Sequence, residues 1–218
     1  MANLIFWILA ASFAGFIVAA IFAGLLKLNR NVYLLIYIPA VLILVYLFVK
    51  YARIPVKETV LHNIIWGLAG AIVISPVLIR NVLSQPASER SKGFTLLTDI
   101  VWPGLIYGIC DALLLSVLPV LAVRMAFSSS DFSSWTVKAG FFLSALAASL
   151  IITTAYHLGY PEFRGKKVIF ANVGNGIMTI AMLLTMNPLT AIIPHSVMHI
   201  ASMIHGKETT GQVPPHYK

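Results

Sequence analysis

The sequence predicts an all-α fold, a polytopic membrane helix bundle of about seven transmembrane helices. Hydrophobic residues make up 59% of the 218 residues and charged residues only 10%, whereas about a quarter of the residues in soluble domains are charged. The hydrophobic residues form apolar runs of roughly 20 residues, the length at which an α-helix crosses a bilayer. Polar segments that contain most of the Lys and Arg residues separate these runs.

Three apolar runs, residues 4–26, 32–49 and 60–79, predict the first three spans. The first run has no Lys or Arg before it and is long enough to span, so we expect a retained helix and not a cleaved signal peptide. After the third run, residues 80–92 form the most polar connection in the first half of the chain, which predicts an exposed loop.

The fourth apolar run, residues 94–127, is longer than one span and is interrupted by Asp99 and by two prolines. Proline removes a backbone donor and bends or breaks a helix. We therefore interpret residues 94–102 as an interfacial or bent lead-in and residues 104–123 as the fourth span.

Residues 135–157 and 168–186 predict the fifth and sixth spans. The seventh span follows after only two residues, so we expect the last two helices to form a tight hairpin. Residues 1–205 are thus expected to form a single transmembrane helical domain. Residues 206–218 form a short polar C-terminal tail, which we expect to be disordered.

The Lys and Arg residues predict an orientation with the N-terminus outside and the C-terminus inside. In this orientation ten of the 15 fall on the inner side and five on the outer side, in agreement with the positive-inside rule.

The net charge of +8 does not indicate a nucleic-acid partner, because the Lys and Arg residues lie between apolar runs and not on one face. We expect an integral protein of the plasma or cytoplasmic membrane that contacts membrane lipids. Cys110 is the only cysteine, so no intrachain disulfide can form.

Two histidines, His195 and His199, lie inside the last apolar run. Four residues is about one helical turn, so the two imidazoles share one face of the helix. A charged side chain in hydrocarbon costs at least a few kcal/mol, and an ionisable pair there therefore indicates a functional site. His205 lies about 240° round the helix from His199 and should not join the pair.

Estimates of depth in the membrane bring two other residues to the level of this pair. Asp111 lies about 10 Å into the fourth span from the inner side, and His157 ends the fifth span on that side. One carboxylate and three imidazoles are enough to build a hydrolytic or metal site. Asp111, His157, His195 and His199 are therefore the candidate catalytic residues and metal ligands, with zinc as the candidate metal. Structural alternatives stay open: Asp111 could bond a neighbouring helix, and His157 could be an interfacial residue.

Asn172, Gly174, Asn175 and Gly176 open the sixth span. They do not indicate a phosphate-binding loop, because no strand precedes them and no P-loop lysine follows. We expect these small residues to let neighbouring helices pack closely.

The last 110 residues or so resemble the CPBP family, the membrane-embedded CAAX prenyl endopeptidases and bacteriocin-processing proteins. Thr153-Thr-Ala-Tyr-His157 resembles the Phe-x-x-x-His motif of that family, with Thr in place of Phe. The segment from Thr185 through Asn187 to His195-Ser-Val-Met-His199 resembles the last motif, with His199 in place of the usual Asn or Asp.

The family's Glu-Glu-x-x-x-Arg motif is where this sequence departs from the pattern. If Arg124 is the motif arginine, the glutamates would fall at Pro119 and Val120, and neither residue can act as a base. Asp111 precedes Pro119 by eight residues, roughly 12 Å along a helix. Asp111 is thus the available carboxylate.

The resemblance implies an intramembrane protease, or a divergent or inactive hydrolase, acting on a peptide or lipid-linked bond. By this resemblance His157 and His195 would bind an oxyanion or a metal, and His199 would replace the Asn. Asp111 would be the general base or a metal ligand. A neutral imidazole can donate to an oxyanion, so His199 is chemically acceptable in that position.

Two alternatives stay open. The first is a zinc-dependent membrane lipid or amide hydrolase, as in the alkaline ceramidase and adiponectin-receptor superfamily, whose last helix also carries His-x-x-x-His. That superfamily has a Ser-x-x-x-His motif before its aspartate, and no such motif precedes Asp111 here. The second is a non-enzymatic transporter or scaffold in which the same residues bind an ion or bond the helices together.

Overall fold

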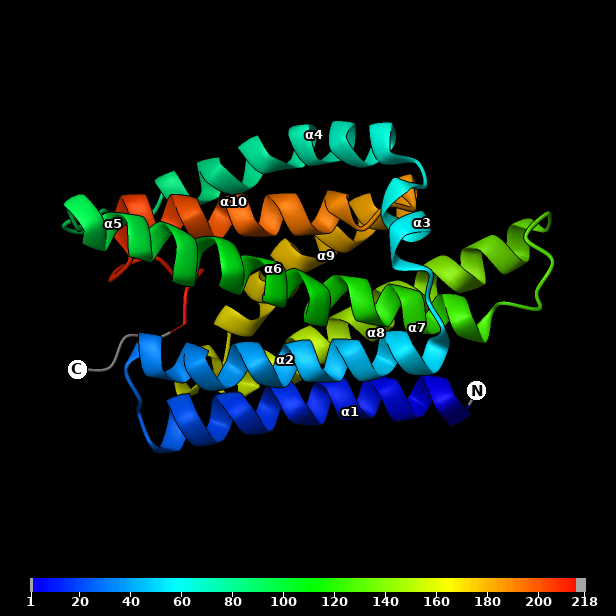
Figure 1. The fold of residues 1–218 in the computed structure, drawn as a ribbon, viewed down its shortest axis with the longest axis horizontal. Coiled ribbons are helices and arrows are strands. Elements are labelled where there is room, and N and C mark those ends of the chain that lie inside the picture. Colours follow the sequence, from blue (N-terminus) through cyan, green and yellow to red (C-terminus); the bar gives the residue numbers. More distant parts are fainter. Residues whose placement is uncertain (1, 215–218) are drawn as a thin grey trace.

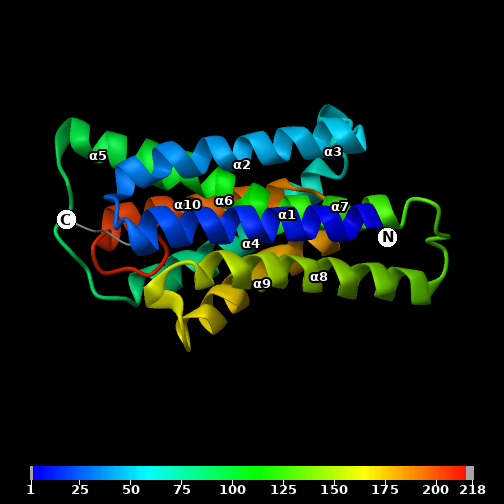
Figure 2. The same cartoon turned by 90° about the horizontal axis from the view of Figure 1, so that it is seen from below.

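The structure is a computed structural model and describes residues 2–214. Among these residues the regular secondary structure is helical throughout, without a β-strand. Most helices run along the long axis of the molecule (Figure 1), with α1 and α2 on one side and α4 and α10 on the other. The second view shows α8 and α9 along a further face of the bundle (Figure 2). The all-α prediction is confirmed.

Six helical segments within residues 2–214 are long and apolar enough to cross a membrane, which supports the prediction of a membrane protein. They are Asn3–Leu25, Arg30–Ala52, Ile64–Leu83, Gly93–Ala126, Trp135–Leu158 and Lys167–Thr185. The seventh predicted span corresponds to α10 (Leu189–Gly206), which is not among these six because three histidines make it less apolar.

Large apolar side chains cover the outside of the bundle. On α4, for example, Ile65, Trp66 and Ile72 are 78%, 68% and 73% exposed. Soluble monomers rarely expose contiguous apolar surface of this kind, whereas lipid-facing helices require it. The outer surface is therefore suited to hydrocarbon.

The N-terminal helices follow the predicted apolar runs closely. Helix α1 (Ala2–Val18) continues into the π-helical segment η1 (Ala19–Leu25). Helix α2 (Arg30–Ala52) begins after Asn29, whose side chain accepts a hydrogen bond from the Val32 backbone N–H at 3.1 Å. This is the usual N-cap interaction of asparagine.

The third predicted span begins later than expected. A short helix, α3 (Val56–Leu61), ends before Asn63, which has a left-handed backbone with φ of 53°. Asparagine tolerates this conformation better than most residues. Helix α4 (Ile64–Leu83) starts directly after it and includes four residues beyond the predicted end.

The fourth apolar run forms one unbroken helical path with two π-helical segments. In order it comprises α5 (Gly93–Asp99), η2 (Ile100–Ile106), α6 (Tyr107–Ala112), η3 (Leu113–Val117) and α7 (Leu118–Ala126). Pro103 lies inside η2 and Pro119 at the start of α7. The two prolines are thus accommodated by local changes of helical register and do not end the helix.

The last helices are α8 (Trp135–Leu158), the short 3-10 turn η4 (Pro161–Phe163), α9 (Lys167–Thr185) and α10. Met186, with φ of 52°, turns the chain between α9 and α10, so the predicted tight hairpin is confirmed. The Asn187 side chain donates to the carbonyls of Val60 and His62 at 2.9 and 2.6 Å. It therefore anchors the hairpin to the end of α3.

The described part of the polar tail is packed against the bundle. The Arg30 guanidinium donates to the carbonyls of Pro214 and Lys207 at 2.8 and 2.7 Å. Lys207 forms an ion pair with Asp99 at 2.8 Å. The expectation of a disordered tail is therefore wrong for residues 207–214, because buried Arg30 requires these acceptors. Residues 215–218 of the predicted tail lie outside the described residues.

Candidate metal centre

A glycine allows two helices of the centre to meet. A Cβ atom added at Gly108 on α6 would lie 2.6 Å from the Ser196 Cα atom on α10. Only a residue without a side chain permits this approach between two backbones. Gly108 precedes Asp111 by three residues, and Ser196 lies between His195 and His199. The contact therefore brings the functional faces of both helices together.

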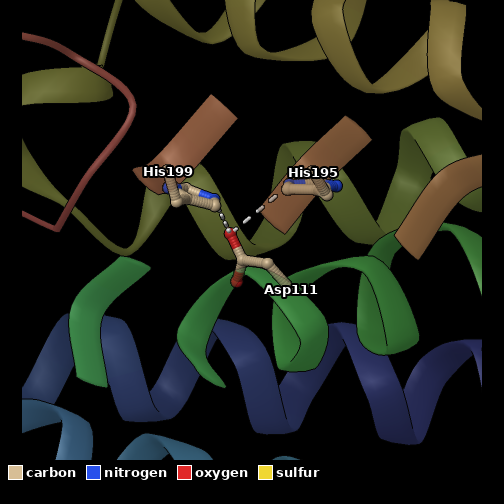
Figure 3. Close-up of side chains that lie close together, drawn as sticks. All are labelled: Asp111, His195 and His199. Atoms are coloured by element: carbon tan, nitrogen blue, oxygen red, sulfur yellow. Dashed lines mark ion pairs between the residues drawn. The ribbon is translucent and has the colours of Figure 1, made fainter. Parts of the chain in front are cut away.

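Asp111, His195 and His199, named here the Asp–His group, converge at this contact (Figure 3). The Asp111 Oδ2 atom lies 3.8 Å from His195 Nε2 and 3.6 Å from His199 Nε2. Each residue offers one ligand atom, and these atoms lie within 4.8 Å of one another. The three residues are 2%, 3% and 1% exposed. Three of the four candidate residues from the sequence are thus brought together.

The distances within the Asp–His group fit a shared cation better than direct hydrogen bonds. Nitrogen and oxygen atoms 3.6–3.8 Å apart are too far apart for a hydrogen bond. Two ligands bound tetrahedrally to zinc at about 2.1 Å lie about 3.4 Å from each other. Small side-chain movements would therefore place the three ligand atoms around one ion.

Ring nitrogens without a hydrogen-bond partner also indicate a bound cation. Among residues 2–214, both ring nitrogens of His199 and the Nδ1 atom of His195 are buried without a hydrogen-bond partner. Buried polar atoms are nearly always bonded, and a cation would satisfy the Nε2 atom of His199. Metal-binding imidazoles usually donate their second N–H to an acceptor, and the described residues supply none to either Nδ1 atom.

The carboxylate of Asp111 has a second partner that the sequence did not indicate. Tyr37 on α2 donates its hydroxyl to Asp111 Oδ1 at 2.5 Å. The Tyr107 ring, one turn before Asp111, lies 4.7 Å from the His199 ring. Sequence reasoning missed Tyr37 because a buried tyrosine in an apolar span resembles ordinary core. The only available signal was its position four residues after Tyr33 and seven after Arg30, which places the three residues on one face of the helix.

Two π-helical segments flank Asp111. Helix α6 has only six residues and lies between η2 and η3. Such segments inside helices are frequent at functional sites, because the altered register redirects side chains. Asp111 lies between two such segments, a change of register that hydropathy does not predict.

His157 is not part of the Asp–His group. Its Nδ1 atom lies 2.8 Å from the Thr153 carbonyl of its own helix, α8. Its ring contacts the rings of Tyr156 and Phe163, with centroids 5.1 and 4.9 Å away. The depth estimate placed His157 at a level along the membrane normal but could not determine its rotation about the helix axis. The structure gives it contacts of a packed residue near a helix end.

Pro119 and Val120, the positions that the CPBP resemblance would align with the glutamates, supply no carboxylate, but Pro119 has a structural effect. Without an N–H, Pro119 cannot donate to the Leu115 carbonyl four residues earlier. That carbonyl instead accepts from Ser149 Oγ at 2.6 Å and from Asn175 Nδ2 at 3.2 Å. A second buried polar cluster therefore lies about one turn from Asp111 along the same helical path.

This second cluster, named here the Asn175 network, joins η3, α8 and α9. Ser116 donates to Asn175 Oδ1 at 2.9 Å, and Asn175 Nδ2 donates to Thr153 Oγ1 at 2.7 Å. Hydroxyl contacts of 2.8–2.9 Å join the remaining members. The members are Ser116, Ser149, Thr153, Asn175 and Thr179.

The expected close packing through the small residues of α9 is wrong for Gly174. A Cβ atom there would meet nothing within 4 Å, and one at Gly176 would make only an ordinary contact at 3.6 Å. Asn175 joins the helices by hydrogen bonds instead, and Asn172 bonds Thr154 on α8 at 2.9 Å. His205 lies apart from the Asp–His group, as expected, with its Nε2 atom 2.9 Å from the Gln85 carbonyl.

No family model matches this chain, and neither does any curated protein or solved structure. The chemistry of the buried groups therefore carries the functional conclusion.

Proposed function

We propose that this protein is a zinc-dependent hydrolase embedded in the membrane, with Asp111, His195 and His199 as its metal ligands. The supporting observation is the buried group of three ligand atoms within 4.8 Å of one another. Two histidines four residues apart on a helix and one carboxylate are a frequent ligand set for catalytic zinc, whose fourth position stays open.

In this proposal each residue of the Asp–His group supplies one metal ligand. His195 and His199 present their Nε2 atoms, and Asp111 presents Oδ2 from the facing helix. A bound zinc ion supplies a Lewis acid and an activated water in such sites. Burial of all three ligands excludes bulk water, which strengthens electrostatic interactions inside the site.

The proposed substrate is a peptide or a lipid-linked amide or ester bond within the membrane. The CPBP-like spacing of the last motif supports this substrate class, and Asp111 meets the histidines where that family uses glutamates. The protein is then a divergent relative in which a metal site replaces the glutamate pair. The same ligand set also suits a zinc lipid hydrolase. Hydrolysis assays with membrane peptides and lipid amides therefore decide which type of bond is cleaved.

The proposed topology has seven spans, with the N-terminus outside and the C-terminus inside the plasma or cytoplasmic membrane. Helix α10 is the seventh span. It contacts α4, α6 and α9, and these neighbours separate its histidines from lipid. The excess of Lys and Arg on the inner side supports the orientation.

Metal analysis of the detergent-purified protein tests the proposal. We expect about one zinc per chain, and we expect His195→Ala, His199→Ala and Asp111→Ala each to lose it. His205→Ala is the matched control, because it removes an imidazole from the same helix outside the Asp–His group. Hydrolysis of membrane peptides and lipid amides, followed by mass spectrometry, should be lost in the same three variants.

The outcomes separate the candidate functions. A protein without bound metal whose hydrolysis survives Asp111→Ala would overturn the proposal. Stoichiometric zinc without hydrolysis of any substrate class would instead favour an ion transporter or a scaffold.

A further inference from the structure

Four buried tyrosines form a closed set of hydrogen bonds next to the Asp–His group. Tyr160 donates its hydroxyl to Tyr33 at 2.6 Å. Hydroxyl contacts join Tyr156 to Tyr33 at 3.4 Å, to Tyr107 at 2.9 Å and to Tyr160 at 2.6 Å. We name this set the phenol cluster; its members are Tyr33, Tyr107, Tyr156 and Tyr160.

A count of donors gives one consistent arrangement in which all four contacts of the phenol cluster are hydrogen bonds. Each phenol has one O–H, and Tyr160 uses its own on Tyr33. Tyr156 must then donate to Tyr160, and Tyr33 and Tyr107 must donate to Tyr156. In this arrangement each of the four O–H groups is used once inside the phenol cluster.

Tyr37 is the fifth buried tyrosine at this place and the one whose O–H is directed to Asp111. Its ring is held by the phenol cluster: it stacks on Tyr33 and Tyr156, with centroids 5.6 and 5.2 Å away, and meets Tyr107 edge-on at 5.5 Å. The Tyr37 hydroxyl therefore has little freedom to point elsewhere.

We propose that Tyr37 is the positioning residue of the metal centre. Its bond occupies Asp111 Oδ1, so the carboxylate presents only Oδ2 to the histidines. Without this bond the carboxylate can rotate about its broad terminal torsion, and both oxygens can reach a metal. No bulk water is available inside the bundle to replace the phenol. This inference rests on the proposed metal site and names the residue that sets its one-oxygen binding mode.

Zinc affinity of the Tyr37→Phe variant, measured by competition with a chromogenic chelator, tests the proposal. Loss of such an outer-shell partner weakens metal binding by about 10–100-fold, and we expect a decrease of this size. Tyr33→Phe is the matched control, since Tyr33 lies on the same helix, is equally buried and does not bond Asp111. We expect its affinity to stay within about twofold of the unaltered protein, because Asp111 keeps its outer-shell partner.

Infrared spectroscopy of the metal-free protein gives a readout that does not depend on zinc. The Asp111 carboxylate band, assigned by subtraction of the Asp111→Asn spectrum, should shift in Tyr37→Phe and stay in place in Tyr33→Phe. If the unaltered protein binds no zinc, the proposed function fails, and this band still decides the role of Tyr37.

A second variant covers the case in which Tyr37→Phe does not fold. 4-Fluorophenylalanine at position 37 fills the space of the hydroxyl but cannot donate a hydrogen bond, so the same losses are expected. Unchanged zinc affinity or an unchanged carboxylate band in a folded variant would overturn the proposal.

Discussion

The Asp–His group and the Asn175 network are both buried polar clusters in one apolar bundle, and they differ in how their polar atoms are satisfied. In the Asn175 network the side chains bond one another and the freed Leu115 carbonyl. In the Asp–His group three ring nitrogens have no hydrogen-bond partner among the described residues. The Asp111 Oδ2 atom lies 3.6 Å from His199 Nε2, beyond hydrogen-bond distance.

This difference distinguishes a structural cluster from a ligand site. A buried network whose groups are bonded internally stabilises helix contacts and needs nothing from outside. Buried groups that converge without bonding one another carry an energetic penalty that a bound ligand can remove. The Asp–His group therefore requires a partner, whereas the Asn175 network does not.

The largest expected effect concerns zinc and the Asp–His group. Ligand at 100 times its Kd stabilises a folded protein by about 2.7 kcal/mol, which corresponds to a rise in Tm of about 5–10 °C for a chain of this size. We expect this rise in the unaltered protein and none in His199→Ala. Thermal unfolding in detergent, followed by circular dichroism with and without zinc, measures it.

The next effect should appear in the Asn175 network. Asn175→Leu removes the bonds of Asn175 to Ser116 and Thr153, but Ser116 keeps its contact with Thr179 and Thr153 still donates to the Ser149 carbonyl. We therefore expect a total cost of about 1–3 kcal/mol. We expect a lower Tm and an unchanged zinc-induced rise. Asn172→Leu is the control, because its partner Thr154 is only partly buried. Loss of the zinc response in Asn175→Leu alone would show that the two clusters are coupled.

An effect of similar size is expected at the contact that assembles the Asp–His group. Gly108→Ala places a methyl group against the α10 backbone, which cannot move aside as a side chain can. Overpacking of this kind costs about 1–3 kcal/mol and should also weaken zinc binding. Gly174→Ala, which meets open space, should change neither Tm nor affinity. Equal zinc affinity in both variants would contradict the assigned role of Gly108.

The smallest effect should occur at Arg124, outside both clusters. Its guanidinium lies 4.1 Å from the centre of the Phe132 ring, and an exposed cation–π contact contributes about 0.5–1 kcal/mol. Arg124→Gln should therefore lower Tm by only about 1–4 °C and leave zinc binding intact. Lys138→Gln, which removes a similar contact with Trp135, is the control. Loss of hydrolysis in Arg124→Gln alone would support its role as the motif arginine.

Much of the helical organisation was predictable, because an apolar run of spanning length has few alternatives to a helix in a membrane. Residues 135–157 were predicted as a span and form α8 (Trp135–Leu158). The start of α4 was missed because a single left-handed residue, Asn63, ends the preceding helix. Hydropathy does not detect such a residue.

The site was partly predictable for a similar reason. The constant rise of a helix places Asp111 and the histidine pair at one depth, and the structure brings them together. The same reasoning included His157, which bonds its own helix instead. The depth of a residue in the membrane follows from its place in the sequence, whereas the direction of its side chain also depends on how the helix is rotated about its axis.

The Asn175 network had a signal that could have found it. Pro119 leaves the Leu115 carbonyl without its usual donor, so a neighbouring helix must supply one. Reasoning from sequence could not say that Ser149 and Asn175 would do so, because neither is near Leu115 in the chain.

The sequence by itself determined the all-α class, the approximate extent of the apolar helices and the shared face of His195 and His199, because these depend on local length and periodicity. Only the tertiary structure decided that this face meets Asp111, that Gly108 permits the approach, and that Tyr37 bonds the carboxylate. Apolar helices in lipid gain little from the hydrophobic effect when they associate. Their rotations therefore depend on close packing and on hydrogen bonds between residues far apart in the chain.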